Sequence, residues 1–224
     1  MASQIYNIPE VAVTKDERFV GKTTILGAGY GMGAVRFQDQ LAISGVDMEL
    51  EEARRVIQVY RGSNWKIGHL WREAQNVLKC IHNMDSAPLG LEGVLTVAPE
   101  HSGIRLPSGL YLRYSDLQFE QEERGPQFNY VTREGRKKIY GGKVVENVCQ
   151  AIARCIIAEQ MLKIPKQYKV VLTVHDSIVC CVPETEVSEA QLSIEKSMRW
   201  IPDWAKGLPL DCESGIGNSY GECV

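Results

Sequence analysis

The chain has 224 residues, of which 44% are hydrophobic and 24% are charged, with a formal net charge of −3 and a pI of about 5.9. This composition is ordinary for a globular protein of one or two domains, and the acidic balance argues against a free-standing nucleic-acid binder, which usually carries a basic excess. No apolar run reaches the roughly 18 residues that a transmembrane helix needs, so we expect no membrane partner.

The N-terminal sequence MASQIYNIPEVAV lacks the basic and apolar regions that a signal peptide contains. The seven cysteines form no CxxC pair, which leaves a zinc site or a thioredoxin-type motif with little support. Both observations predict a reducing, cytoplasmic setting.

Residues 16–41 are predicted to form a helix, although its glycines each cost about 1 kcal/mol relative to alanine. This helix contains the stretch RFVGKTTILGAGYGMG, which has the letters of two phosphate-binding motifs. A P-loop needs a glycine five residues before its Gly-Lys pair, and Asp16 stands there, so that interpretation fails. Gly29, Gly31 and Ala34 fit a dinucleotide-binding turn, but such a turn follows a strand, and the preceding TTIL is short.

Four side chains of the same stretch follow one another at intervals of four residues: Arg18, Lys22, Leu26 and Tyr30. On a helix they would form one stripe. Two cations and an aromatic ring suit a nucleotide, because cations bind phosphates and a ring stacks on a base. The alternative, from this stretch alone, is a solvated basic turn beside a buried tyrosine.

The next segments continue as helices and then change to strands. Acidic residues open a short amphipathic helix over 49–60, and apolar residues recur at helical spacing over 64–83. Residues 86–145 contain apolar and aromatic runs around a proline–glycine turn, which is typical of strands. The predicted fold class is therefore α+β, a helical part followed by an antiparallel sheet with packed helices.

For the remaining chain we expect a helix over 142–163, a hairpin over 169–183, a helix over 187–201 and a last strand within LPLDCESGIG (208–217). The hairpin is inferred from two β-branched runs that flank HDS, which places His175, Asp176 and Ser177 at its tip. An exposed acid between two buried strands is a rigid place for a metal ligand. The alternative is that Asp176 only makes the turn.

In this order the motifs resemble the C-terminal part of family A (polymerase I type) DNA polymerases, most closely their bacteriophage members. Arg18-x3-Lys22-x7-Tyr30-Gly31 resembles motif B, the fingers helix that grips the incoming dNTP, and Val174-His175-Asp176-Ser177 resembles motif C, the palm hairpin. The palm helix before motif C is matched by Tyr140-Gly-Gly-Lys143, Glu146-Asn147 and Gln150-Ala-Ile-Ala-Arg154. The resemblance extends over nearly the whole chain.

The resemblance implies a fingers subdomain over residues 1–85, with the motif B helix near 16–41, and a palm portion over 86–224, with helix 142–163 and hairpin 169–183. It implies that dNTPs and primer–template DNA are the partners.

The resemblance also implies roles for single residues. Arg18 and Lys22 would contact the dNTP triphosphate, Leu26 would face its sugar, and Tyr30 would close the pocket on the nascent base pair. Gln150 and His175 would contact the DNA. Asp176 would bind Mg²⁺ and would be, with Lys22, a catalytic residue.

Three departures from the family pattern limit these implications. Leu26 replaces the usual phenylalanine or tyrosine, which puts sugar discrimination in doubt. Ser177 replaces the usual glutamate, which should weaken metal binding. No segment before Arg18 fits motif A, which supplies the other essential aspartate, and thumb and exonuclease are missing as well. We therefore expect either a split enzyme, whose second polypeptide carries motif A and thumb, or a fragment.

Two functions of other classes remain as alternatives. One is a non-catalytic remnant of such a polymerase that binds DNA or nucleotides. The other is a nucleotide-cofactor oxidoreductase built on Gly29, Gly31 and Ala34, which leaves the HDS hairpin unexplained.

Overall fold

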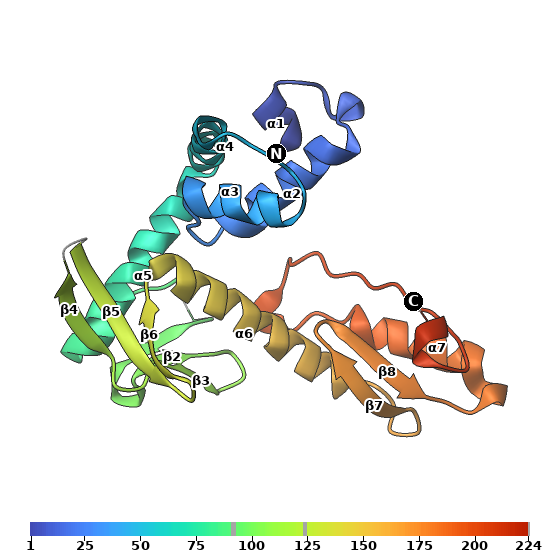
Figure 1. Ribbon diagram of the computed structural model, residues 1–224. Helices are drawn as coiled ribbons and strands as arrows, with labels where there is room; N and C mark the ends of the chain where they lie inside the picture. Colours follow the sequence, from blue (N-terminus) through green and yellow to red (C-terminus); the bar gives the residue numbers. More distant parts are fainter. Residues whose placement is uncertain (91–92, 123–124, 224) are drawn as a thin grey trace. The chain divides into compact units, whose positions relative to one another are not determined.

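The structure is a computed structural model that describes residues 1–90, 93–122 and 125–223. It divides into two compact units (Figure 1). Unit 1 comprises Met1–Arg105 and Tyr111–Val148, and unit 2 comprises Leu106–Leu110 and the residues from Cys149 onward. The predicted boundary between residues 85 and 86 separates fingers from palm. The division into two compact units does not test that prediction.

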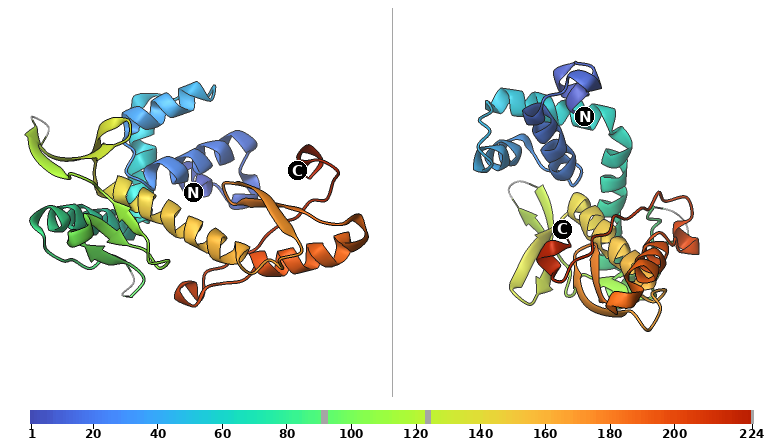
Figure 2. Two further views of the ribbon diagram at one scale, coloured as in Figure 1. Left: turned by 90° about the horizontal axis from the view of Figure 1, so that it is seen from below. Right: turned by 90° about the vertical axis from the view of Figure 1, so that its right-hand side faces the viewer.

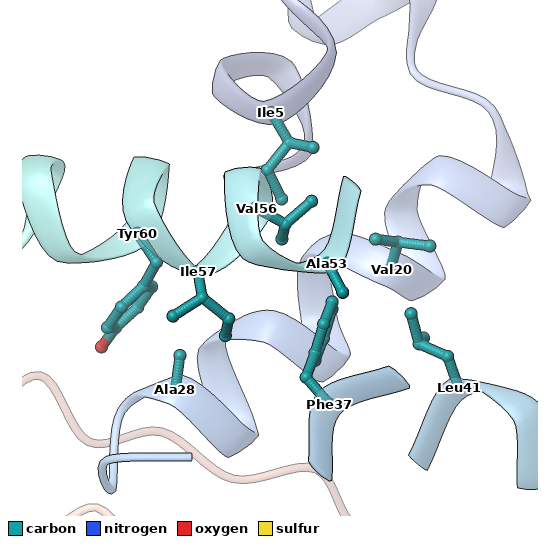
Figure 3. Packing of buried hydrophobic residues seen from close by; sticks show 9 residues of the cluster. All are labelled: Ile5, Val20, Ala28, Phe37, Leu41, Ala53, Val56, Ile57 and Tyr60. Atoms are coloured by element: carbon teal, nitrogen blue, oxygen red, sulfur yellow. The ribbon is translucent and has the colours of Figure 1, made fainter. Parts of the chain in front are cut away.

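Unit 1 begins with four helices: α1 (Ala2–Tyr6), α2 (Lys15–Ala28), α3 (Ala34–Ile43) and α4 (Leu50–Ser63). The start of α2 is fixed by a capping box, in which the Thr14 side chain accepts from the Glu17 backbone N–H and the Glu17 carboxylate accepts from the Thr14 N–H. Figure 3 shows the apolar side of α4 facing side chains of the other three helices. The side chains in Figure 3 form one buried core, which includes Phe37, Leu41 and Val56, all with 0% exposure. Since α2 packs against this core, the core orients α2.

The single helix predicted over 16–41 is wrong, because the chain has two helices there, α2 and α3. The break falls at the glycine-rich stretch between them. Gly31 has a φ of +88°, a conformation that glycine adopts without the steric cost of a side chain. Tyr30 lies in this turn, so only Arg18, Lys22 and Leu26 share the face of one helix.

The same break excludes the dinucleotide-binding turn. TTIL, which precedes the glycines, lies within α2, whereas that motif requires a strand before its glycines. The oxidoreductase alternative has therefore lost its structural basis.

The rest of unit 1 consists of α5 (Trp65–Asn83) and two small antiparallel sheets. The first sheet has the order β1-β2-β3, and the second has the order β4-β5-β6. Their strands are β1 (Thr96–Ala98), β2 (Gly103–Arg105), β3 (Tyr111–Arg113), β4 (Gln118–Glu122), β5 (Gly125–Thr132) and β6 (Gly135–Ile139). His82 at the end of α5 packs its ring against Phe119 and Phe128, which holds the second sheet beside α5 (Figure 1).

Helix α6 (Gly141–Met161) begins in unit 1 and continues into unit 2. Unit 2 also contains the hairpin β7 (Lys169–Val174) and β8 (Ser177–Cys181) and helix α7 (Val187–Met198). The hairpin lies beside α7 in both views of Figure 2, and Ile164, Tyr168 and Ala190 form the buried cluster between them. Short 3-10 helices occupy Glu10–Ala12, Pro99–His101, Glu184–Glu186, Asp203–Ala205 and Tyr220–Glu222.

These elements confirm the predicted α+β class, with helices first and small antiparallel sheets with helices afterwards. The expected last strand is wrong, since the described residues 208–217 contain no strand. This segment is held by side chains instead. Arg199 at the end of α7 donates from Nε to the Asp211 carboxylate (2.6 Å) and from Nη2 to the Cys212 carbonyl (3.0 Å).

The expectation of two buried strands in the hairpin is also wrong. Val171 and Leu172 on β7 are 49% and 45% exposed. A bulge interrupts the pairing between Val170 and Leu172, and the small cluster against α7 covers only part of the hairpin. None of the described helices combines the length and the apolar character that crossing a bilayer requires.

Candidate functional site

The outer face of α2 carries three of the predicted nucleotide-binding residues. Arg18, Lys22 and Leu26 are exposed, and Leu26 retains 60% of its accessible surface. They line a cavity of about 460 Å³ together with residues of the N-terminal segment, among them Ser3 and Glu10. Its two cations can bind a phosphate group, and its apolar side chains, Leu26 among them, can contact the flat side of a sugar or base.

The opposite side of α2 is fixed by close packing. Val20 and Thr24 are buried, and the Thr24 hydroxyl donates to the Val20 carbonyl at 2.7 Å. Gly21 lies beside the cationic face and lines the same cavity, and a Cβ there would lie 2.8 Å from the backbone nitrogen of Ala2, so α1 approaches α2 at a position that admits only glycine without a shift. This packing turns the cationic face of α2 outward.

Tyr30 occupies the turn after α2, where it is half-buried. The Trp71 indole Nε1–H donates to the carbonyl of the neighbouring Gly29 at 3.0 Å. Burial raises the pKa of the Tyr60 hydroxyl, and the nearby Tyr30 hydroxyl raises that pKa further. The Tyr60 phenol therefore stays protonated at neutral pH.

A second cavity in unit 1, of about 590 Å³, lies beside this turn. Aromatic and guanidinium side chains line it, namely Arg61, Trp65, Trp71, Arg72 and Tyr140. Trp65 is 64% exposed, which is unusual for a tryptophan, and Tyr140 is 39% exposed. Planar rings beside cations can stack on nucleobases and bind phosphates.

Sequence reasoning missed this cavity. The spacing of apolar residues over 64–83 predicted a helix, and no site was assigned to Trp65 or Trp71. The position of Trp65 could have distinguished it from a core residue, because it is the first residue of α5, after Asn64.

The residues of α6 that resemble the palm helix make local contacts. The Lys143 ammonium and the Glu146 carboxylate form an ion pair at 2.8 Å, and the Asn147 amide donates to the Tyr114 hydroxyl at 3.4 Å. Burial raises the pKa of Tyr114, whose hydroxyl therefore stays protonated. Gln150 is exposed, in the part of α6 that belongs to unit 2.

The hairpin tip in unit 2 consists of His175 and Asp176, since Val174 pairs with Ser177. His175, Asp176 and Ser177 are all exposed. His175 has a φ of +54°, in the left-handed region where the first residue of such a two-residue turn is usually glycine. A histidine there stores roughly 1 kcal/mol of backbone strain, and strain of this kind gathers at functional sites.

The donors available for a metal ion at this tip are few. Among the described residues, no group of three or more His, Cys, Asp or Glu side chains is arranged to hold a metal ion. Asp176 offers one exposed carboxylate, and the Ser177 hydroxyl is uncharged. This donor set fits Mg²⁺, which proteins commonly bind through one or two carboxylates together with waters and substrate phosphates.

The predicted site residues therefore fall into two groups. Arg18, Lys22, Leu26 and Tyr30 lie in unit 1, with the first three on one cavity. Gln150, His175 and Asp176 lie in unit 2, where His175 and Asp176 are neighbours at the hairpin tip.

Known proteins are similar to this chain in sequence and in fold, although no protein-family model matches it. The chain is 32% identical to the DNA polymerase of Bacillus phage SP02 over 238 aligned positions, which cover 98% of this chain and 35% of that protein. Its fold matches the solved POL domain of Pol1 from M. smegmatis in complex with DNA primer–template and dNTP. That match has a TM-score of 0.52 and 17% identity over 88% of this chain and 30% of the other. The chain thus spans about a third of the length of each.

Proposed function

Because this chain is a partial homologue of family A (polymerase I type) DNA polymerases, we propose that it forms the fingers and part of the palm of a template-directed DNA polymerase. The observation that carries this proposal is the 32% identity to a phage polymerase over 98% of the chain. The motifs named above lie within that span.

In this proposal, the exposed face of α2 binds the incoming dNTP. Arg18 and Lys22 stand one helical turn apart and are both exposed, so their charges can reach one triphosphate. Leu26, one turn further, offers the sugar an apolar contact. Tyr30 contributes its ring from the turn and contacts the nascent base pair.

The hairpin tip is the proposed place of the reaction in unit 2. Asp176 would hold Mg²⁺, which supplies charge stabilisation to phosphoryl transfer when it is bound. His175 and Gln150 are exposed donors for the primer–template backbone and bases. The aromatic cavity beside Tyr30 offers its rings to unpaired template bases and its arginines to template phosphates.

The test is magnesium-dependent primer extension by the full chain, with and without a second polypeptide that carries the motif A strand. The variant Asp176→Ala is compared with Asp203→Ala, an exposed aspartate of the same unit. We expect Asp176→Ala to lower the rate by about a thousandfold or more, since metal stabilisation amounts to several kcal/mol. Extension that survives Asp176→Ala would refute the role of this residue.

The alternative is a non-catalytic remnant that binds DNA or nucleotides. Ser177 in place of a second carboxylate favours it. It predicts salt-sensitive DNA binding, because phosphate contacts release counterions, and no incorporation in any mixture. Extension by the reconstituted pair rules it out.

A further inference from the structure

The start of α6 packs backbone against backbone on two other segments of unit 1, the turn after α2 and helix α5. A Cβ at Gly142 would lie 2.5 Å from the Tyr30 carbonyl oxygen and 3.0 Å from the Tyr30 carbonyl carbon. A Cβ at Gly141 would lie 1.9 Å from the Trp71 carbonyl oxygen. Because real Cβ atoms do not approach backbone so closely, both positions require glycine for this packing.

Two hydrogen bonds tie the same three segments together. The Trp71 side chain donates to the Gly29 carbonyl at 3.0 Å, which connects α5 to the turn. The Gly141 backbone N–H donates to the Gln75 side-chain oxygen at 2.8 Å, which connects α6 to α5. Trp71 thus holds the carbonyl before Tyr30, and Gly142 packs against the carbonyl of Tyr30 itself. The backbone is therefore held on both sides of the Tyr30 side chain.

We propose that Trp71 and Gly142 are positioning residues for Tyr30: together they fix the turn and so determine where its ring stands relative to a dNTP on α2. The effect on dNTP binding rests on the proposed function. The positioning of Tyr30 rests on the packing alone. Neither residue needs to contact the nucleotide.

The main test compares Gly142→Ala with Gly62→Ala. Gly62 lies in α4, where an added Cβ meets nothing within 4 Å, so this control changes a helical glycine without a clash. Trp71→Phe is the second variant, which keeps an aromatic ring and removes the Nε1–H donor. It keeps the proposal falsifiable if Gly142→Ala fails to fold.

The first readout is independent of nucleotide binding. Trp71→Phe identifies the Trp71 indole proton signal in a ¹⁵N NMR spectrum, and amide hydrogen exchange is measured at residues 29–31. We expect Gly142→Ala to shift the indole signal and to accelerate exchange in the turn, while Gly62→Ala does neither. Exchange in the turn that is unchanged in both Gly142→Ala and Trp71→Phe would overturn the proposal.

The second readout is dNTP binding to the full chain by calorimetry. We expect Gly142→Ala and Trp71→Phe each to raise the Kd by about tenfold or more, because small misplacements of a contact group have large effects. Wild-type affinity in Trp71→Phe would overturn the positioning role. If the wild-type chain binds no dNTP, the proposed nucleotide site fails, and the NMR comparison still decides whether Trp71 and Gly142 position Tyr30.

Discussion

The turn after α2 and the β7–β8 hairpin both bear residues of the proposed site, yet they are held in different ways. Around the turn, buried side chains and glycine contacts fix the backbone from several sides. The hairpin has a small cluster on α7 and exposed apolar residues on β7. Tyr30 is therefore positioned by tertiary packing, whereas Asp176 is positioned by the local geometry of a two-residue turn.

The largest expected difference between the two regions is in stability. Phe37→Ala should lower the free energy of unfolding by about 3–5 kcal/mol, because the ring is fully buried between α2 and α4. Leu172→Ala in the hairpin should cost less than about 1 kcal/mol, because its side chain is half exposed. Chemical denaturation monitored by hydrogen exchange would measure the stability of each unit separately. Equal losses would contradict the comparison.

The next expected effect concerns binding at the packed region. Lys22→Ala should weaken dNTP binding by roughly ten- to a hundredfold, since a charged hydrogen bond contributes about 1.5–3 kcal/mol. The control is Arg36→Ala, which removes another exposed cation from the neighbouring helix α3. Calorimetry with a dNTP measures both. A similar loss in the two variants would mean that net charge alone attracts the nucleotide.

At the hairpin, a substitution of His175 should weaken function without lowering stability. His175→Gly should leave the free energy of unfolding unchanged or raise it by up to about 1 kcal/mol, because it relieves the left-handed strain but adds freedom to the unfolded chain. Ser177→Gly, on β8, relieves no left-handed strain, so it should lower the free energy of unfolding. Thermal unfolding gives the first result, and DNA binding should weaken in His175→Gly. A clear destabilisation by His175→Gly would show that its side chain holds the hairpin.

The smallest effect concerns the segment that follows α7. The Ser214 hydroxyl and Arg199 lower the pKa of Glu195 below its ordinary value of 4.5, and Arg199 lowers that of Asp211 below 3.8. Carboxyls with depressed pKa values stabilise the fold above their unfolded pKa, and this contribution is lost as the pH falls through the folded pKa. Protease resistance of residues 206–214 should therefore decrease as the pH falls below the ordinary pKa of 4.5 of Glu195 and through the lowered folded-state pKa values of Glu195 and Asp211. In Arg199→Ala this acid-induced decrease should be smaller.

Local patterns in the sequence predicted most of the elements. The helices over 49–60 and 64–83 are confirmed as α4 and α5, because their apolar spacing matches the faces that they bury. The hairpin around HDS is confirmed as β7 and β8. Both signals are short-range, and tertiary contacts agree with them.

The errors have a common physical origin. A stripe at intervals of four residues assumes a continuous helix, and the glycines between α2 and α3 end it before Tyr30. A strand needs a partner to accept its backbone hydrogen bonds, and residues 208–217 are held by Arg199 instead. The cavity beside Tyr30 joins α5 to the start of α6, two segments far apart in the sequence, so no local pattern reveals it.

The contact between Gly21 and Ala2 has a consequence for the evolution of this protein. A side chain at position 21 would collide with the backbone of residue 2, and not with a flexible side-chain end. Among relatives, an alanine or larger residue at position 21 should therefore occur only where the short N-terminal helix is displaced or missing. The residues at positions 2 and 21 should therefore change together among relatives.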